Sequence, residues 1–259
     1  MKIYVISLPE SDRRVAIAKQ FEKNNTTFEF FDAVDGRREN IEQYDAARRI
    51  RMKAHGMTPG ENGCFASHRK LWRKSIELNE PILILEDDVN ITDEFWDELP
   101  SMESLALHFS YVRLGRGTPK KLFGMPWFIL SGKTFTGLDR RLVKYMRGPS
   151  CTHAYVISPE ASSRLLAHSV HWWWPVDDYM DYDFIHGVNN IGVEPPLVLQ
   201  TDIPSVIGYA ERKKGKRSTI ARIRKEVYRF IYGLRSLMYN ARFVVTQILK
   251  RRGLNEFRL

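Results

Sequence analysis

The apolar run at residues 81–85 and the three acidic residues after it limit the fold more than any other feature of this chain. Ile82 to Leu85 are all apolar, so both faces of this segment are expected to be buried, as in a central strand of a parallel sheet. Glu86, Asp87 and Asp88 follow at its carboxyl end. Open α/β sheets bind their ligands at that end of the strands.

The segments before and after this strand favour an α/β fold. Residues 2–8 and 28–31 are typical of strands, and a helix is expected from Ser11 or Asp12 to about residue 23. Gly60 to Gly63 indicate a break before an amphipathic helix at 64–79. This alternation predicts a parallel α/β sheet. Residues 37–58 are expected to form helix and loop. Further strands are expected at 111–114, 154–158 and 193–199, and a helix at 159–168.

Bulk composition sets the broad class of protein. The chain has 259 residues and is 43% hydrophobic, enough for one large buried core. Its two cysteines, Cys64 and Cys151, are too few for a disulfide framework and fit a reducing compartment. The first apolar run is too short for a signal peptide, and no run approaches the roughly 20 apolar residues of a membrane span. A cytoplasmic location is therefore expected.

The net charge of +9 is unevenly distributed. Residues 210–259 contain 15 Lys and Arg against 3 Asp and Glu, a net charge of +12, which leaves residues 1–209 at −3. This contrast predicts a main domain at 1–209 and a basic tail at 210–259. Residues 213–217 (KKGKR) resemble a linker, and a helical pattern begins near Thr219.

The acidic run is a candidate metal site. Adjacent carboxylates raise each other's pKa, and a divalent cation relieves that repulsion. Hard oxygen ligands suit Mg²⁺ or Mn²⁺. Because alternate residues of a strand face the same side, Glu86 and Asp88 are expected to point together, with Asp87 facing the other way. For these three residues alone, a charged turn is an equally good interpretation.

Six short motifs occur in the order of a known family: residues 6–14, 31–36, 60–68, 84–89, 154–158 and 175–177. Together they resemble the motif series of glycosyltransferase family 25, the lipooligosaccharide galactosyl- and glucosyltransferases, to which collagen galactosyltransferases are related. The resemblance covers residues 1–207. It implies a single GT-A-like catalytic domain, which is Rossmann-like with a mainly parallel sheet. Asn62 departs from the family, which usually has an apolar residue there.

The resemblance implies a role for individual residues. Manganese or magnesium would bind through Glu86 and Asp88. The donor, UDP-galactose or UDP-glucose, would contact Leu8, Arg13, Arg14, Asp35, Gly36, Glu61, Ser67, His68 and Asp87. Without the resemblance, the two arginines are solvated helix charges, Asp35 is a turn residue, His68 is a core histidine and Cys64 is a small buried side chain.

Residues 171–179 (HWWWPVDDY) form a second informative segment. Three consecutive tryptophans are not expected to face one core, so at least one of Trp172, Trp173 and Trp174 should line a surface or cleft and bind the acceptor sugar. Asp177, or else Asp178, is the expected base that deprotonates the acceptor hydroxyl. A buried aromatic anchor beside a helix cap is the alternative. Asp181 and Asp183 are expected on a helix surface.

The tail has a basic amphipathic pattern. From Ile220 its apolar residues recur every three or four positions, and the remaining face is rich in arginine. This pattern suits an anionic membrane surface. A helix packed on the main domain is the alternative. Nucleic acid is disfavoured, because the main domain has no excess of positive charge.

These expectations combine into one function. The chain would transfer a hexose, galactose before glucose, from a UDP-sugar to a hydroxyl of a lipid-linked lipooligosaccharide acceptor, with inversion to a β-linkage. It would lie on the inner face of a bacterial inner membrane as a peripheral protein. The competing interpretations are a metal-dependent nuclease and a membrane-tethered carbohydrate-binding protein.

Overall fold

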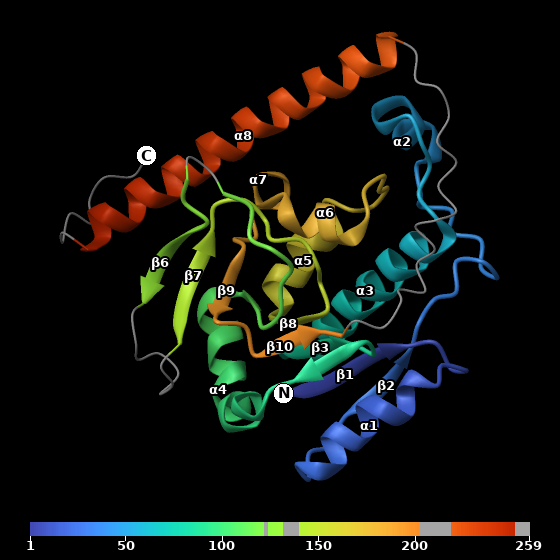
Figure 1. Ribbon diagram of the computed structural model, residues 1–259, viewed down its shortest axis with the longest axis vertical. Helices are drawn as coiled ribbons and strands as arrows, with labels where there is room; N and C mark the ends of the chain where they lie inside the picture. Colours follow the sequence, from blue (N-terminus) through green and yellow to red (C-terminus); the bar gives the residue numbers. More distant parts are fainter. Residues whose placement is uncertain (122–123, 132–139, 202–218, 252–259) are drawn as a thin grey trace.

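The computed structural model describes residues 1–121, 124–131, 140–201 and 219–251. Its main feature is an eight-stranded sheet (Figure 1), whose strands in chain order are β1 (Lys2–Ser7), β2 (Glu29–Asp32), β3 (Ile82–Glu86), β5 (Tyr111–Arg113), β6 (Trp127–Ser131), β7 (Arg141–Tyr145), β8 (Ala154–Ile157) and β9 (Ile191–Glu194). A separate antiparallel pair contains β4 (Val89–Ile91) and β10 (Val198–Gln200).

Helices cover the sheet and one side of the molecule. They are α1 (Arg13–Lys23), α2 (Ala46–Lys53), α3 (Pro59–Leu78), α4 (Asp93–Phe109), α5 (Pro159–Ala167), α6 (Val176–Asp181), α7 (Asp183–His186) and α8 (Thr219–Arg251). None of the described helices is long and apolar enough to cross a bilayer. The expected linker at 213–217 and the expected boundary between residues 209 and 210 lie outside the described residues.

The strand order β2-β1-β3-β8-β5-β9-β7-β6 makes the sheet mixed. β1 is parallel to both β2 and β3, as the alternation of strands and helices predicted. β8, however, lies antiparallel between β3 and β5, and β7 is antiparallel to both β6 and β9. The expectation of a mainly parallel sheet is therefore wrong beyond its first three strands. The single strand expected at 193–199 is also wrong, because β9 and β10 occupy that region.

β3 contributes to a hydrophobic core on each face of the sheet. Ile82 and Ile84 pack with α3 and α5 on one face, whereas Leu83 and Leu85 pack with α1 and α4 on the other. All four side chains are fully buried. The strand is central, as predicted, although one of its two neighbours is antiparallel.

The start of α3 corrects the expected break at Gly60 to Gly63. Thr58 and Glu61 form a capping box, in which the Thr58 hydroxyl accepts from the Glu61 N–H at 3.1 Å and the Glu61 carboxylate accepts from the Thr58 N–H at 2.7 Å. A Cβ on Gly63 would lie only 2.2 Å from the Val34 carbonyl oxygen. The glycine therefore permits close backbone contact in the first turn and does not end a helix.

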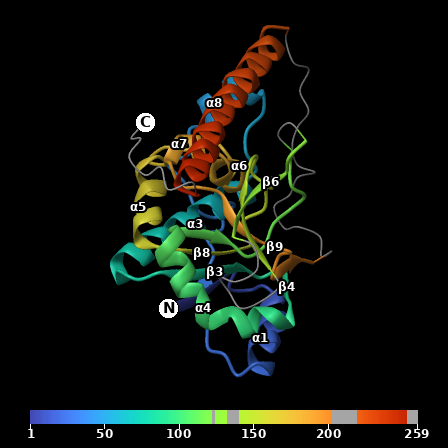
Figure 2. The same ribbon diagram turned by 90° about the vertical axis from the view of Figure 1, so that its left-hand side faces the viewer.

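The C-terminal helix α8 crosses the molecule above α6 and α7 (Figures 1 and 2). It docks through polar and aromatic side chains. The buried Asn240 accepts from Lys144 Nζ at 2.9 Å and donates to the Met146 carbonyl at 3.0 Å. Tyr228 is only 6% exposed, and its hydroxyl accepts from Trp174 Nε1 at 2.9 Å. The tail is thus a helix packed on the main domain, one of the alternatives considered for its sequence.

Candidate active site

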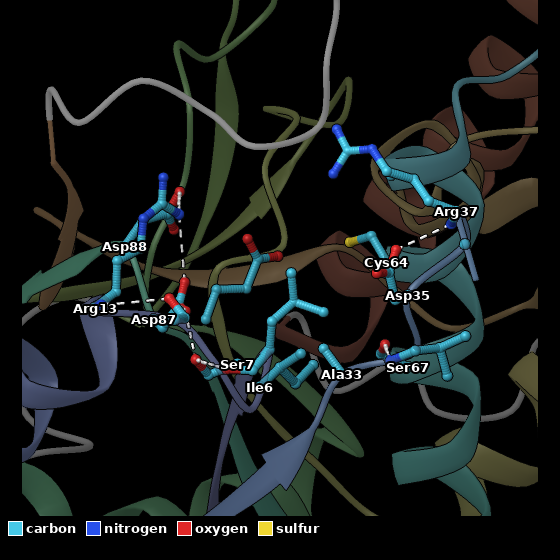
Figure 3. Close-up of a pocket in the computed structure, with 16 residues that line it drawn as sticks. Ile6, Ser7, Arg13, Ala33, Asp35, Arg37, Cys64, Ser67, Asp87 and Asp88 are labelled. Atoms are coloured by element: carbon cyan, nitrogen blue, oxygen red, sulfur yellow. Dashed lines mark hydrogen bonds and ion pairs between the residues drawn. The ribbon is translucent and has the colours of Figure 1, made fainter. Parts of the chain in front are cut away.

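The carboxyl ends of β1, β2 and β3 meet at one edge of the sheet because the three strands are parallel. A first cavity opens there, enclosing about 740 Å³ when its mouth is included. Figure 3 shows Arg13, Asp87 and Asp88 on one wall and Asp35, Arg37 and Cys64 on the other. The predicted residues Leu8, Gly36 and Ser67 also line it, as does Glu86.

Asp87 is anchored in one wall of the first cavity. Its Oδ2 accepts from the Ser7 hydroxyl at 2.6 Å and from the Ser11 hydroxyl at 3.0 Å. Arg13 Nη1 lies 3.4 Å from Asp87 Oδ1 and 3.5 Å from Asp88 Oδ2, so one guanidinium offsets the charge of both carboxylates. Asp87 thereby holds the start of α1 against the end of β3.

The carboxyl groups of Glu86 and Asp88 both have raised pKa values. Burial raises the pKa of Glu86, and the nearby Asp177 carboxylate raises it further. Burial, followed by the charge of Glu86, raises the pKa of Asp88 to about 6. Asp88 Oδ1 is buried and has no hydrogen-bond partner among the described residues. An orphaned carboxylate oxygen beside a second acid fits a hard divalent cation, which would supply the missing positive charge.

The opposite wall is built around the backbone of Val34 and Gly36. Val34 N–H donates to Ser67 Oγ at 2.8 Å, and the Ser67 hydroxyl donates to the Gly63 carbonyl at 2.7 Å. A Cβ on Gly36 would lie 2.1 Å from the Pro59 carbonyl oxygen. Asp35 accepts from the Arg37 N–H at 3.0 Å, which shapes the turn. Ser67 and Gly36 thus position this wall through the backbone.

Arg14 is not one of the described residues that line the first cavity. Its guanidinium donates to the carbonyls of Ser7 and Leu8 at 2.9 and 3.1 Å and pairs with Asp32. It also lies over the Phe30 ring, 4.7 Å from the centroid. These contacts fasten the ends of β1 and β2, so the structure gives Arg14 a supporting position.

A second cavity adjoins the first and shares Cys64, Glu86 and Asp88 with it. It encloses about 780 Å³ with its mouth, and Glu61, Thr152, His153 and Asp177 also line it. The Thr152 hydroxyl is 2.7 Å from Asp177 Oδ1 and 3.3 Å from Glu86 Oε1, which brings two predicted acids to one hydroxyl group. Asp178 is not among the described lining residues, so the geometry favours Asp177 over Asp178.

Thr152 and His153 line the second cavity but were not predicted as site residues. Both immediately precede β8, and because β8 is antiparallel to β3, its amino end lies at the same edge as the carboxyl end of β3. In the predicted parallel sheet, site residues follow strands and do not precede them. An isolated threonine and histidine gave no other signal in the sequence.

His68 is fully buried and supports Glu86. Burial lowers the pKa of His68 to about 4, so its ring is neutral near pH 7. Its Nε2 lies 3.3 Å from Glu86 Oε1, and its Nδ1 lies 2.8 Å from the Tyr155 hydroxyl. A neutral ring that donates from Nε2 to the carboxylate must accept at Nδ1 from Tyr155. His68 thus orients one side of Glu86.

Cys64, His68 and Glu86 form a possible ligand group, with donor atoms within 4.8 Å of one another. Burial raises the pKa of the Cys64 thiol well above its ordinary value, and the carboxylates of Glu86 and Asp177 add to this effect. A protonated thiol is a weak ligand, because metal binding requires the thiolate. The chemistry of the donor atoms therefore favours Glu86 and Asp88, the predicted pair, for a hard cation.

The expectation that a tryptophan would line a surface or cleft is wrong. Trp172, Trp173 and Trp174 are 1%, 1% and 5% exposed. Trp172 stacks on Phe65 with 4.6 Å between ring centroids, while the other two pack near Tyr228 of α8. The sequence could not show that α3 and α8 approach this segment from different sides, which provides a core for all three rings. Their burial leaves no face for a sugar.

The surface positions expected for Asp181 and Asp183 are also wrong. Asp181 accepts from Arg113 Nη2 at 3.0 Å, and Asp183 pairs with Lys144 at 2.5 Å. All four side chains are nearly inaccessible to solvent. Two buried ion pairs thus hold α6 and α7 on the sheet, a role that a pattern of local helix positions does not reveal.

The raised pKa of Asp88 predicts how stability depends on pH without bound metal. Between about pH 4 and pH 6 the folded state retains a proton that the unfolded state has lost, so the free energy of unfolding should fall as pH rises. The loss due to Asp88 should be at most about 3 kcal/mol. Denaturant unfolding with a chelator present, compared between wild type and Asp88→Asn, measures it. The same pH dependence in both proteins would contradict the prediction.

Comparison with known proteins supports the family resemblance of the sequence. The profile of glycosyltransferase family 25 (LPS biosynthesis protein) matches residues 1–180. Lipooligosaccharide biosynthesis protein lic2B of Haemophilus influenzae is 32% identical over 178 residues, which are 64% of this chain and 62% of that protein. The lacto-N-neotetraose biosynthesis glycosyltransferase LgtB of Neisseria meningitidis serogroup B is 38% identical over 92 residues, 34% of this chain and 33% of that protein.

Another relative bears on activity. Inactive glycosyltransferase 25 family member 3 of Mus musculus is 26% identical over 202 residues, 71% of this chain and 32% of that protein. The chain thus spans less than two thirds of the length of these relatives, and one of them is named inactive. Because the family profile matches well over half of the 259 residues, the chain belongs to glycosyltransferase family 25.

Proposed function

We propose that this chain is a GT-A-type glycosyltransferase that moves a hexose, galactose before glucose, from a UDP-sugar to a saccharide hydroxyl. One observation carries the proposal: Glu86 and Asp88 line both cavities, so they lie between a pocket built from family motifs and a pocket containing Asp177. A donor in the first cavity and an acceptor in the second would meet at these acids.

The first cavity suits a nucleotide sugar. Arg13 and Arg37 bring positive charge to its two walls, and Asp35 offers a carboxylate that can accept from ribose hydroxyls. Manganese or magnesium held by Glu86 and Asp88 would neutralise the diphosphate as it leaves. The two carboxylates have raised pKa values, so binding a cation would also relieve their mutual repulsion.

Asp177 is the proposed general base. Asp177 lies in the first turn of α6 and lines the second cavity. Its Oδ1 accepts from the Thr152 hydroxyl at 2.7 Å. In the reaction, the acceptor oxygen bonds to the sugar carbon C1 as the bond from C1 to the diphosphate oxygen breaks. The hydroxyl proton passes to Asp177, and UDP leaves with the electron pair of the broken bond. Attack opposite the leaving group inverts C1 and gives a β-linkage.

The acceptor is proposed to be a lipooligosaccharide. Two relatives support this choice, since they are named for lipooligosaccharide biosynthesis and lacto-N-neotetraose biosynthesis. A lipid-linked acceptor would require the enzyme to work at a membrane surface, and α8 offers a suitable face. We therefore place the protein at the inner face of the inner membrane, in contact with anionic lipid.

The outer face of α8 is apolar and accessible. Ile223, Val227 and Phe230 are 60%, 52% and 72% exposed, and the same stripe continues to Ile248. The helix contains eight Lys and Arg against one Glu. The apolar side chains would be buried in the membrane interface. Each basic residue near anionic lipid would contribute about 1 kcal/mol to binding.

Loss of the proposed cation site should abolish transfer. Asp88→Ala should reduce manganese-dependent release of UDP from UDP-galactose by about a hundredfold or more, the scale of losing one strong electrostatic contact in a reaction. Asp97→Ala removes an exposed acid of α4 and should leave the rate unchanged. A panel of UDP-sugars assayed with the wild type also identifies the hexose. Full activity of Asp88→Ala would refute the assignment.

The two adjacent acids of α6 should behave differently. Asp177→Asn should lower the transfer rate by a factor of about 10² to 10⁴, as expected for loss of a general base, while the affinity for UDP stays unchanged. Asp178→Asn should have a much smaller effect, because this residue does not line the second cavity. Rates and UDP affinity measured for both variants test the assignment; equal losses would argue against it.

Membrane binding can be tested without removing α8, whose deletion would uncover the buried Lys144 and Trp174. Ile223→Glu/Phe230→Glu should reduce sedimentation with phosphatidylglycerol vesicles at least tenfold. The control Val15→Glu/Leu107→Glu places the same charges at positions that are 61% and 65% exposed on other helices. Equal binding by the two double variants would rule out this surface.

The competing functions make different predictions. A nuclease should cleave DNA in the presence of manganese, whereas the proposed enzyme should not. A carbohydrate-binding protein should bind saccharides without consuming UDP-galactose. The buried tryptophans already weaken this second interpretation, because it depended on their exposed ring faces.

A further inference from the structure

A third cavity lies between α8 and the segment carrying α6 and α7, with one residue of α2 at its edge. It encloses about 1010 Å³ when its mouth is included. Five cationic side chains line it: Lys53, Lys120, Arg147, Lys225 and Arg229. Asp181 is the one acid among its described lining residues. We call it the basic cavity. Figure 1 shows α8 above α6, with α2 near the beginning of α8.

The charge of the basic cavity is only partly compensated, because Arg229 pairs with Glu226 at 3.0 Å and Lys120 lies 3.4 Å from Asp181. The Asp181 carboxylate already accepts from Arg113 at 3.0 Å and from the Ser150 N–H, with Lys120 at 3.4 Å. Within the described part of the chain, Lys53, Arg147 and Lys225 have no carboxylate oxygen within 4.0 Å. Their arrangement is expected to attract an anion.

The environment of Lys53 reflects this accumulation of positive charge. Burial lowers the pKa of its ammonium group, and the like charges of Arg49, Lys225 and Arg229 lower it further, while Asp178 partly offsets them. A bound anion would reverse the repulsive part of this effect. Lys53 Nζ also lies over the Tyr228 ring, 5.1 Å from its centroid, so it is held at the wall of the cavity.

Aromatic rings form another part of the wall. Tyr182, Phe184 and Tyr232 line the cavity and are half-buried. They pack edge to face, with 5.1 Å between the Tyr182 and Tyr232 rings and 5.3 Å between the Phe184 and Tyr232 rings. Such rings can pack against the C–H groups of a sugar, which simple phosphate does not offer. The combination suits an anionic group on a saccharide.

Helix α6 reaches from the second cavity to the basic cavity. Asp177 at the start of this helix lines the second cavity, and Asp181 at its end lines the basic cavity. The helix rise separates the two residues by about 6 Å along its axis. Ser150 binds Lys120 and Asp181 and is followed by Cys151 and Thr152 of the second cavity. The two cavities thus lie at the two ends of α6, and residues 150–152 lead from one to the other.

We propose that the basic cavity binds a phosphate group carried by the saccharide acceptor, close to the sugar whose hydroxyl receives the hexose. This inference rests on the proposed function for its acceptor, but the cavity's own ligand can be measured separately. Glucose 6-phosphate is a soluble probe with the required chemistry. Glucose and inorganic phosphate each represent one half of it.

Calorimetry on the full chain tests the inference, with saturating UDP and manganese to occupy the first cavity. Lys53→Gln/Lys225→Gln should bind glucose 6-phosphate at least tenfold more weakly than the control Lys19→Gln/Arg222→Gln. The control removes two positive charges from residues that do not line the cavity. Circular dichroism checks the fold, and Lys225→Glu provides a second variant that leaves Lys53 in place.

The outcomes are distinct. Wild type should bind glucose 6-phosphate more tightly than glucose or inorganic phosphate. Equal affinity of the two double variants would overturn the site, and equal affinity for inorganic phosphate would overturn the saccharide ligand. Displacement of glucose 6-phosphate by phosphatidylglycerol vesicles from Ile223→Glu/Phe230→Glu, which lacks the proposed membrane contact of α8, would assign the cavity to a lipid headgroup and overturn the proposal.

The proposed function can fail independently of this site. Binding of glucose 6-phosphate requires no sugar transfer, so its loss in Lys53→Gln/Lys225→Gln supports the cavity even if UDP-galactose is never consumed. Conversely, normal transfer without phosphosugar binding would overturn the cavity and leave the proposed function intact. With an active enzyme, phosphorylation of the acceptor should lower its KM in wild type but not in the double variant.

Discussion

The site depends on the burial of β3 between β1 and β8. Four apolar residues of this strand anchor the cores on both faces of the sheet, and the next residue is Glu86. The acids therefore begin where a low-dielectric interior meets the cavities, which explains why the pKa values of Glu86 and Asp88 are raised. The same packing that stabilises the sheet also makes these carboxylates receptive to positive charge.

The first cavity was largely predictable from sequence. Parallel pairing of β1, β2 and β3 gathers the residues that follow these strands, and this is a general property of βαβ units. Leu8, Asp35 and Asp88 line one cavity, as their positions after strands suggested. It was less predictable that Arg14 and Ser67 would bind the backbone of the strand ends and the wall.

The second cavity was harder to predict because it depends on long-range topology. β8 joins β3 in the antiparallel direction, and nothing in the local pattern of residues 154–157 distinguishes this from a parallel strand. The same difficulty explains the tryptophans and Asp181. Their burial requires partners from α3, α8 and β5 that are distant in sequence. The amphipathic pattern of α8 was visible, but its docking through Tyr228 and Asn240 was not.

The close contact between Gly36 and the start of α3 has a consequence for changing the specificity of the proposed donor cavity. A Cβ at Gly36 or Gly63 would lie within 2.2 Å of a carbonyl oxygen, so backbone atoms alone form this part of the wall. Side-chain replacement cannot widen it, and any larger residue would push the turn away from α3. Attempts to accept a different donor should therefore vary Leu8 and Arg37, whose side chains can change size while the frame around them stays intact.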